Sequence, residues 1–393
     1  MLNRKRFWYF HLLLIVISFF FQTSALAYDI TEKFSIGGVL AGAYQHQTGD
    51  DIDDKGRGAI PFQPGLSLRP TENDEVFAKF GFAAGNGLNG ATEFNLAPWA
   101  ADLEDDVKDI NGRNRDYLLT VWYKHSFELS DNNTLGLTGG IIDSTGYIDE
   151  NAYANDEYTQ FMNEALVNAP NGFIPSYDIG GAVEWEIGNW DITAVGLNVG
   201  ENEDGKNFNF FAAQIGYKLN TSLGEGNYRL IVDGTSKAFL NADGEKESRM
   251  AAFLSFDQAL GEIFGAWIRF GLQDDGALVN YDYLLSGGIN ITGRWYGRGD
   301  DNIGIGYAYL NGADDSDFDD TQVAEVYWRF VLNDYFAVTA DVQYMADEFN
   351  NDEDDSAGMG TGTDIEYVET YEGKLIPVKI QTVTMTNTTA AKI

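Results

Sequence analysis

The chain has 393 residues, no cysteine, 44 glycines and 55 aromatic residues (26 Phe, 21 Tyr and 8 Trp), and its formal net charge is −36. The absence of cysteine argues against a disulfide-stapled scaffold. The acidity makes nucleic acid an unsuitable partner, because phosphate binding requires clustered Lys and Arg.

The N-terminus has the three parts of a secretory signal. A basic start (residues 4–6) precedes an apolar run (residues 7–21), and Ala25-Leu26-Ala27 forms a small-x-small cleavage site. No later stretch approaches the run of about 20 apolar residues that a membrane helix needs. We therefore predict a cleaved signal peptide over residues 1–27 and one exported domain over residues 28–393, either a β-barrel or a soluble protein.

Apolar and polar residues alternate with the two-residue period of a β-strand along the whole exported part. About ten residues of apolar-out, polar-in alternation per strand is what lipid outside and water inside demand. We count roughly sixteen such segments. They span residues 34–46, 59–68, 76–84, 117–129, 134–142, 177–187, 190–199, 208–219, 227–239, 250–260, 263–272, 278–292, 303–310, 323–332, 335–344 and 375–385.

The links between these segments alternate between long and short. The long links include residues 47–58, 85–116, 143–176, 311–321 and the acidic stretch 346–371. The short links include residues 71–75, 130–133, 188–189, 261–262 and 333–334. This pattern predicts an all-β fold, a closed antiparallel transmembrane β-barrel of about 16 strands with short periplasmic turns and long outer loops. Closure would remove the sheet edges that lipid cannot satisfy.

The link over residues 143–176 contains a predicted helix. Asn155 is a suitable N-cap, and Asp156 and Glu157 fall in the first turn. Apolar residues follow at helical spacing from Tyr158 to Leu166, and Pro170 ends the run. Because long loops with their own helix are usually functional, we expect this one to fold into the lumen and narrow it.

Strand parity places charged and aromatic side chains on the inner face of the barrel. Both signs of charge on a wetted wall suit a polar solute that passes along weak sites, although any water-filled barrel would carry charges. The lining thus predicts a channel without naming its solute. The predicted inward-facing residues are Lys79, Lys124, Arg229, Arg249, Arg269, Arg329, Glu184, Glu186, Asp233, Asp257, Glu325, Asp341, Trp267 and Tyr327.

The sequence offers little for catalysis. The exported part has only two histidines, His46 and His125, and no nucleophile, zinc or phosphate-loop motif. We expect no enzyme activity and no cofactor. Carboxylates concentrate in the links, where Asp314, Asp315 and Asp317 form a weak candidate for divalent cations. A solvated acidic rim explains the same cluster.

Several stretches resemble the carbohydrate-selective porin (OprB) family over roughly residues 75 to 345. They are NAYANDEYTQFMNEALVN (151–168) with PSYDIGGAVEWE after it, EFNLAPWAADLEDDV (93–107), GRNRDYLLTVWYKHSF (112–127) and SFDQALGEIFGAWIRFGLQD (255–274). The resemblance implies a sixteen-stranded outer-membrane porin whose infolded loops form a constriction lined by acidic and arginine side chains. Such a channel passes glucose-like sugars by diffusion.

The resemblance also implies which residues form the constriction. Its loop would supply Asp143, Asp149, Glu150, Asn151, Asn155, Asp156 and Glu157, the preceding loop Arg113 and Arg115, and the wall Arg269. From the inward parity we add Trp267, Arg229, Arg329 and Glu184 to the predicted solute path.

We therefore expect a passive channel in the bacterial outer membrane for small hydrophilic solutes, with sugars first. The acidity keeps a general cation-preferring porin open as an alternative, and a structural or adhesive barrel is a further one. Expected partners are membrane lipid, lipopolysaccharide, small sugars, the outer-membrane assembly machinery and further copies in a homotrimer. The chain ends TMTNTTAAKI rather than on the aromatic residue that the resemblance implies, so the bounds of the last strand stay open.

Overall fold

The computed structural model describes residues 28–49 and 52–350, and almost all of its regular structure is antiparallel β-sheet. One 18-stranded sheet holds every strand except a short two-stranded ribbon, β13 (Phe239–Leu240) with β14 (Lys246–Glu247). The strands of the large sheet are β1 (Tyr28–Thr31), β2 (Phe34–Leu40), β3 (Ala43–Gly49), β4 (Ile52–Thr71), β5 (Asp74–Phe80), β6 (Phe82–Ala84), β7 (Leu118–Ser130), β8 (Asn133–Ile142), β9 (Asp178–Ile187), β10 (Trp190–Val199), β11 (Phe208–Thr221), β12 (Gly224–Thr235), β15 (Met250–Leu260), β16 (Phe264–Gln273), β17 (Tyr281–Thr292), β18 (Asn302–Gly312), β19 (Phe318–Asn333) and β20 (Phe336–Phe349).

Neighbours in the chain are neighbours in the sheet. From β7 to β12 and from β15 to β20 each strand pairs with the next, and β12 pairs with β15. At the N-terminal end, β4 pairs with β2 and β3 on one side and with β5 and β6 on the other. Among the described residues, no pairing joins β20 to β1, β2 or β3, so this part of the sheet is open.

Fifteen of the sixteen predicted segments coincide with strand structure, although 34–46 and 76–84 each divide into two strands, and the sixteenth, residues 375–385, lies outside the described residues. The short strand β1 was missed, because four residues are too few to show a period. The predicted long link over residues 47–58 is wrong, since β3 and β4 stay paired as far as Gly49 and Ile52. The predicted link 311–321 shrinks to residues 313–317 because β18 and β19 extend into it.

The two faces of the sheet differ in chemistry as the alternation predicts. In β19, the exposed residues Val326 and Trp328 alternate with the buried residues Glu325, Tyr327 and Arg329. Similar outward rows of exposed apolar side chains run along β11 and β16. Charged groups are therefore held on the inner face, and hydrocarbon groups cover the outer one.

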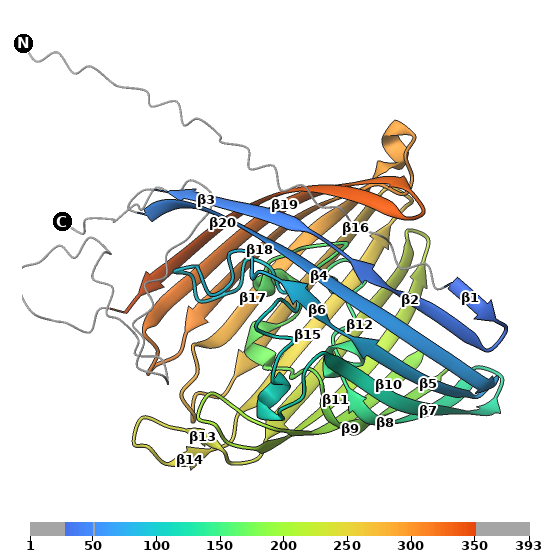
Figure 1. Cartoon of the computed structure of the whole chain (residues 1–393), viewed down its shortest axis with the longest axis horizontal. Coiled ribbons are helices and arrows are strands. Elements are labelled where there is room, and N and C mark those ends of the chain that lie inside the picture. The colour runs from blue at the N-terminus through green and yellow to red at the C-terminus, as the bar shows by residue number, and fades with distance from the viewer. Residues whose placement is uncertain (1–27, 50–51, 351–393) are drawn as a thin grey trace, which may run out of the picture.

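Two long connections lie inside the curve of the sheet, between β4 in front and the strands behind it (Figure 1). In the first, residues 85–117, Asp102 accepts a hydrogen bond from Gln63 Nε2 of β4 at 2.6 Å. In the second, residues 143–177, Asn151 Nδ2 donates to Ser255 Oγ of β15 at 3.2 Å. The sheet thus faces these two connections from opposite sides.

The helix predicted in the second connection is much shorter than expected. The structure has α1 (Glu164–Val167), and its N-cap is Asn163, whose side chain accepts from Ala165 N–H, rather than Asn155. Upstream, Asp156 Oδ1 binds the N–H groups of Tyr158 and Thr159 in a turn. The prediction was wrong because Glu325 accepts the N–H groups of Met162 and Asn163, which a continuous helix would have bonded to its own carbonyls one turn earlier. No helix in the described part of the chain is long and apolar enough to cross a bilayer.

A glycine of β18 makes room for the second connection. A Cβ atom on Gly306 would lie 2.8 Å from the ring of Phe161 and 3.2 Å from a methyl group of Leu166. The fully buried Phe161 ring cannot yield easily, because it meets Trp267 and Tyr327 edge-on at centroid distances of 5.6 and 5.1 Å. Glycine inside a strand here marks a close approach of another segment.

The variant Gly306→Ala should therefore loosen the second connection while the sheet persists. Overpacking of this kind costs about 1–3 kcal/mol. We expect faster amide hydrogen exchange over residues 143–177 in the folded, detergent-solubilised protein. The matched control is Gly139→Ala, since a Cβ there meets nothing within 4 Å. Equal exchange rates in both variants would contradict this account of Gly306.

Candidate functional site

The two infolded connections are hydrogen-bonded to each other into one unit. Ala100 N–H donates to the Met162 carbonyl at 2.8 Å, and Trp99 Nε1 donates to the Glu157 carbonyl at 3.2 Å. Glu164 Oε2 in turn accepts from Ala97 N–H at 2.9 Å. A site built from both connections therefore moves and packs as one body.

Arg269 of β16 attaches this unit to the sheet. Its guanidinium is fully buried and lies 2.8 Å from an oxygen of Asp149, which is also fully buried. The same group donates to the carbonyls of Leu166 and Val167 at 3.0 and 3.1 Å, and to that of Ala154. A planar fork of N–H donors is what allows one side chain to bind several backbone oxygens.

Glu325 of β19 is a second attachment of opposite charge. Its two carboxylate oxygens accept the successive N–H groups of Met162 and Asn163 at 2.6 and 2.9 Å. Because this side chain is 1% exposed, these hydrogen bonds are what satisfies it. Asn163 Nδ2 also donates to Gln343 Oε1 of β20 at 3.0 Å, so the start of α1 is fixed from two strands.

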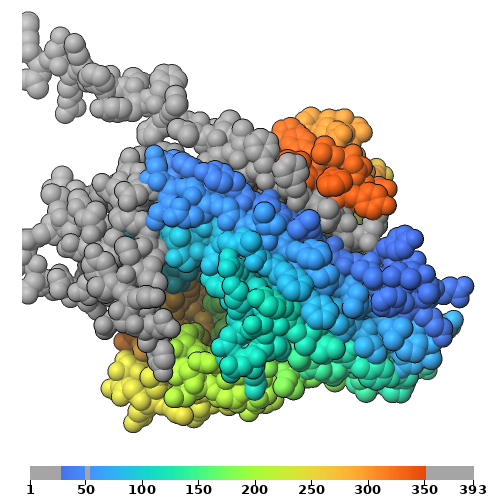
Figure 2. Space-filling model, viewed as in Figure 1, coloured from blue at the N-terminus to red at the C-terminus, as the bar shows by residue number. Residues whose placement is uncertain are grey.

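The attachments leave a cavity of about 620 Å³ between the infolded unit and the wall formed by β2, β4 and β5. This volume falls in the range of small-molecule sites, roughly 300–1,000 Å³. On the molecular surface a hollow opens beside the infolded residues, and the far wall is visible through it (Figure 2). The polar and aromatic lining of the 620 Å³ cavity includes Gln63, Lys79, Asp102, Asp143, Asn155, Asp156, Glu157, Tyr158, Glu164, Asn168, Phe173 and Tyr177.

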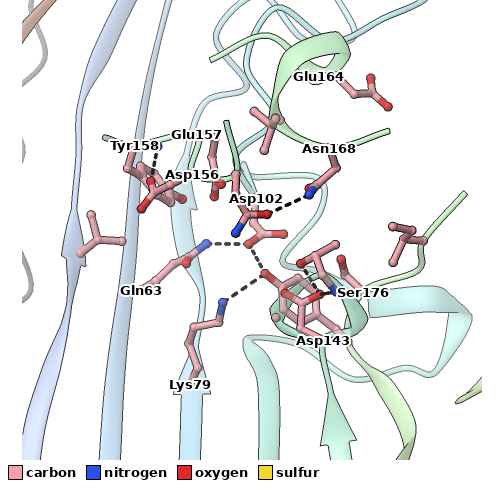
Figure 3. A pocket seen from close by; sticks show the side chains of 18 of the residues that line it. Gln63, Lys79, Asp102, Asp143, Asp156, Glu157, Tyr158, Glu164, Asn168 and Ser176 are labelled. Atoms are coloured by element: carbon pink, nitrogen blue, oxygen red, sulfur yellow. Dashed lines mark hydrogen bonds between the residues drawn. The ribbon is translucent and has the colours of Figure 1, made fainter. Parts of the chain in front are cut away.

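A chain of hydrogen bonds crosses the cavity wall (Figure 3). Lys79 Nζ of β5 donates to Tyr177 Oη at 3.3 Å, and Tyr177 Oη donates to Asp102 Oδ2 at 2.6 Å. Gln63 Nε2 of β4 donates to the same oxygen at 2.6 Å. Two strands and both connections thus meet at Asp102.

Burial raises the pKa of several acids in the cavity. The pKa of Glu157 lies well above its usual range because burial disfavours its charge, and the neighbouring Asp156 and Asp102 raise it further while Lys79 opposes them. Burial likewise raises the pKa of Glu164. A cation that entered the cavity would favour the charged form of both groups.

The structure brings four of the predicted constriction residues, Asp143, Asn155, Asp156 and Glu157, together at the cavity. Their role in solute passage stays a prediction. Asp143 also caps a short turn through Thr145 N–H at 3.1 Å.

Other predicted residues lie where the infolded unit meets the sheet. Asp149, Asn151, Arg269 and Trp267 are all buried there, so none of them faces the cavity. Glu150, which the same loop supplies, is exposed.

The remaining predicted residues are distributed over the mouth and the wall. Arg113 pairs with the buried Asp178 at 3.2 Å, and Arg115 donates to the Tyr177 carbonyl. On the wall, ion pairs join Arg229 to Asp257 at 2.7 Å and Lys124 to Glu184 at 2.6 Å, while Arg329 is 9% exposed. Most of these residues thus form ion pairs or hydrogen bonds around the infolded unit rather than lining the cavity.

Sequence reasoning did not assign Gln63, Asp102, Glu164 and Tyr177 to the site, and it placed Lys79 on the inner face without assigning it a role. Only the folding of residues 85–117 against β4 and β5 brings these groups together. The available signal was weak, namely the inward parity of Lys79 and the position of Asp102 in a long link.

The predicted cation cluster does not assemble in the structure. Asp314, Asp315 and Asp317 are exposed. Within residues 28–49 and 52–350, the group of three acids whose oxygen atoms lie within 4.8 Å of one another is instead Asp319, Asp320 and Glu348. Strand pairing between β19 and β20 is what gathers the latter three.

The variant Arg269→Met should release the infolded unit. Loss of the guanidinium leaves Asp149 buried without a cation, which costs about 3–5 kcal/mol of folding stability. We expect proteolysis within residues 143–177 to accelerate at least about tenfold in the folded protein. Lys237→Met is the control, because the Lys237–Glu247 pair lies on the surface, where such pairs contribute about 1 kcal/mol or less. An unchanged cleavage rate in Arg269→Met would refute the attachment.

Comparisons with known proteins agree with this architecture. A family model described as "Carbohydrate-selective porin, OprB family" matches residues 75–367. A protein of Aquifex aeolicus (strain VF5), described as uncharacterized, is 31% identical over 283 residues, which cover 70% of this chain and 80% of that protein. The solved structure titled "High pH structure of Pseudomonas putida OprB" is similar with a TM-score of 0.57 and 14% identity, over 84% of this chain and 94% of that one, and this shows the likeness of fold. The chain therefore belongs to the carbohydrate-selective porin (OprB) family, and it is an outer-membrane porin for small solutes, a channel rather than an enzyme.

Proposed function

We propose that carbohydrates cross the outer membrane by passive diffusion through the 620 Å³ cavity, which acts as the constriction of a closed barrel of about 16 strands. The observation that carries this proposal is the place of the cavity, between the wall strands on one side and the infolded unit on the other. In this proposal the unit, including α1, lies in the lumen and narrows it.

The lining suits sugars for chemical reasons. Carboxylates such as Asp143 and amides such as Asn155 and Asn168 can exchange hydrogen bonds with hydroxyl groups. The rings of Tyr158 and Phe173 offer flat apolar faces to a sugar ring. The buried hydroxyl of Tyr158 has no hydrogen-bond partner among the described residues, so a solute hydroxyl could supply one. Many weak contacts allow a solute to enter and to leave.

Closure of the barrel is supported by the cost of a free edge. Among the described residues, β20 pairs only with β19, β1 only with β2 and β3 only with β4, so one edge of each strand has no partner. Unpaired backbone groups cannot face hydrocarbon. We therefore retain residues 28–393 as one barrel domain after removal of residues 1–27, with assembly by the outer-membrane machinery, contact with lipopolysaccharide and a homotrimer as further proposals.

A general cation-preferring porin is the second candidate, and the formal charge of −36 favours it. Sugar block separates the two candidates. In planar bilayers a sugar constriction should give stepwise conductance that falls on addition of glucose or maltose. Steps that are indifferent to sugar support the general porin, and the absence of steps contradicts both.

The variant Glu157→Gln should weaken block by glucose. At a pH high enough to ionise Glu157, whose pKa burial raises, the change removes a charged acceptor from the cavity. The loss of one charge-assisted hydrogen bond of about 1.5 kcal/mol corresponds to a roughly tenfold weaker block. The matched control Glu262→Gln lies in the turn between β15 and β16, where the side chain is 82% exposed. Unchanged block in Glu157→Gln, with normal conductance steps, would remove this residue from the sugar path.

A further inference from the structure

The charged groups that line the cavity are strongly unequal in sign. Five carboxyl groups face one ammonium group, and the lining contains no arginine. Of the arginines near the infolded unit, Arg269 is buried beneath it, and Arg113 pairs with Asp178. Arg329 lies on the wall outside the lining, where its charge attracts that of Asp156. A solute in the cavity therefore meets carboxyl groups and Lys79, but no guanidinium.

The single ammonium is already matched by an acid. Tyr177 lies between Lys79 and Asp102 and is hydrogen-bonded to both, so these two opposite charges compensate each other. Lys79 Nζ also lies 5.1 Å from the centre of the Tyr177 ring. Little of the Lys79 charge is left for a passing anion.

Four carboxyl groups then remain without a cation in the lining, although the charge of Arg329 on the wall attracts that of Asp156. Among the described residues none of them forms an ion pair. Three are oriented by hydrogen bonds from the infolded unit itself: Asp143 from Thr145, Asp156 from Tyr158 and Thr159, and Glu164 from Ala97. No hydrogen bond from another described residue reaches the carboxylate of Glu157. The described surroundings thus hold three of these groups in place by hydrogen bonds and form no ion pair with any of the four.

We propose that this cavity selects carbohydrates by charge, an inference that rests on the proposed sugar path. The cavity admits neutral sugars and cationic amino sugars, and it excludes sugar acids and sugar phosphates. Low-dielectric walls focus the field of like charges into a narrow site, so the effect on a charged solute is larger than it would be in open water. An amino sugar keeps the ring and hydroxyl groups that the lining binds, and its ammonium supplies the missing cation. A uronate of the same size brings a further negative charge next to Asp143 and Asp156, and next to Glu157 and Glu164 where the pH is high enough to ionise these two.

The selectivity should also depend on pH. Because burial raises the pKa of Glu157 and Glu164, these groups lose charge at a higher pH than exposed acids do. The charged groups that face Glu157 are Asp156, Asp102 and Lys79. Lowering the pH from about 9 to about 5 should therefore reduce the preference for cations in the wild-type channel.

Three probes of similar size test the proposal in planar bilayers containing the full-length channel. Glucose is measured by its block of the current, and glucosamine hydrochloride and potassium glucuronate by zero-current potentials against KCl. We expect the permeability of glucosammonium relative to K⁺ to exceed that of glucuronate relative to Cl⁻ at least about tenfold near neutral pH. Glu157→Gln should lower this ratio about threefold, and Lys79→Met should raise it. The exposed control Glu262→Gln should leave it unchanged.

The outcomes separate this inference from the function on which it rests. Block by glucose together with equal or reversed permeabilities of the two charged sugars would overturn charge selection and leave the sugar path intact. Conductance without any glucose block would overturn the sugar path itself. A ratio that Glu157→Gln and Glu262→Gln change equally would place the selective charges outside the cavity and overturn the assignment to it.

Discussion

Two buried side chains of opposite charge, Arg269 and Glu325, hold the infolded connections against the sheet, and the cavity exists because of them. Each is satisfied by backbone groups of residues 143–177: Arg269 by carbonyls, Glu325 by N–H groups. A buried charge is costly unless it is fully hydrogen-bonded. If the connection left the wall, both side chains would lose these hydrogen bonds. The two side chains therefore fix the position of the loop.

The same attachments explain which groups remain open to a solute. Arg269, Trp267 and Tyr327, which parity places on the inner face, contact the loop and hold it: Arg269 binds Asp149 and loop carbonyls, and the two aromatic rings pack edge-on against Phe161. What is left facing the cavity comes from the opposite wall, Gln63 and Lys79, and from the turns of the connections themselves. The cavity is thus lined by the residues that do not pack between the loop and the sheet, and acidic residues outnumber basic ones among them.

Membership of the OprB family and the fold likeness to the Pseudomonas putida protein place this chain among outer-membrane porins. Within that frame the chemistry of this chain's own residues sets the expected behaviour. If sugars cross through the cavity as we propose, its hydroxyl-binding groups and aromatic faces favour them, and its excess of carboxyl groups favours those sugars that carry no negative charge. One wall of the path is rigid strand, and the other is a loop unit whose position depends on buried polar contacts.

The sequence alone determined the strands and the two chemically different faces, because alternation reports the surroundings of each residue directly. It placed Trp190–Val199 and Met250–Leu260 at their observed bounds, and the quoted motifs indicated the family. It also identified the connection over 143–176 as special and named Asp156 and Glu157 within it. The tertiary structure alone decided that α1 is a four-residue helix capped by Asn163, that Arg269 is buried beneath the loop, and that Asp102 meets Lys79 through Tyr177. These outcomes depend on contacts between residues far apart in the chain, such as Met162 with Glu325, which are 163 positions apart. A periodicity that spans only a few neighbours carries no record of such contacts.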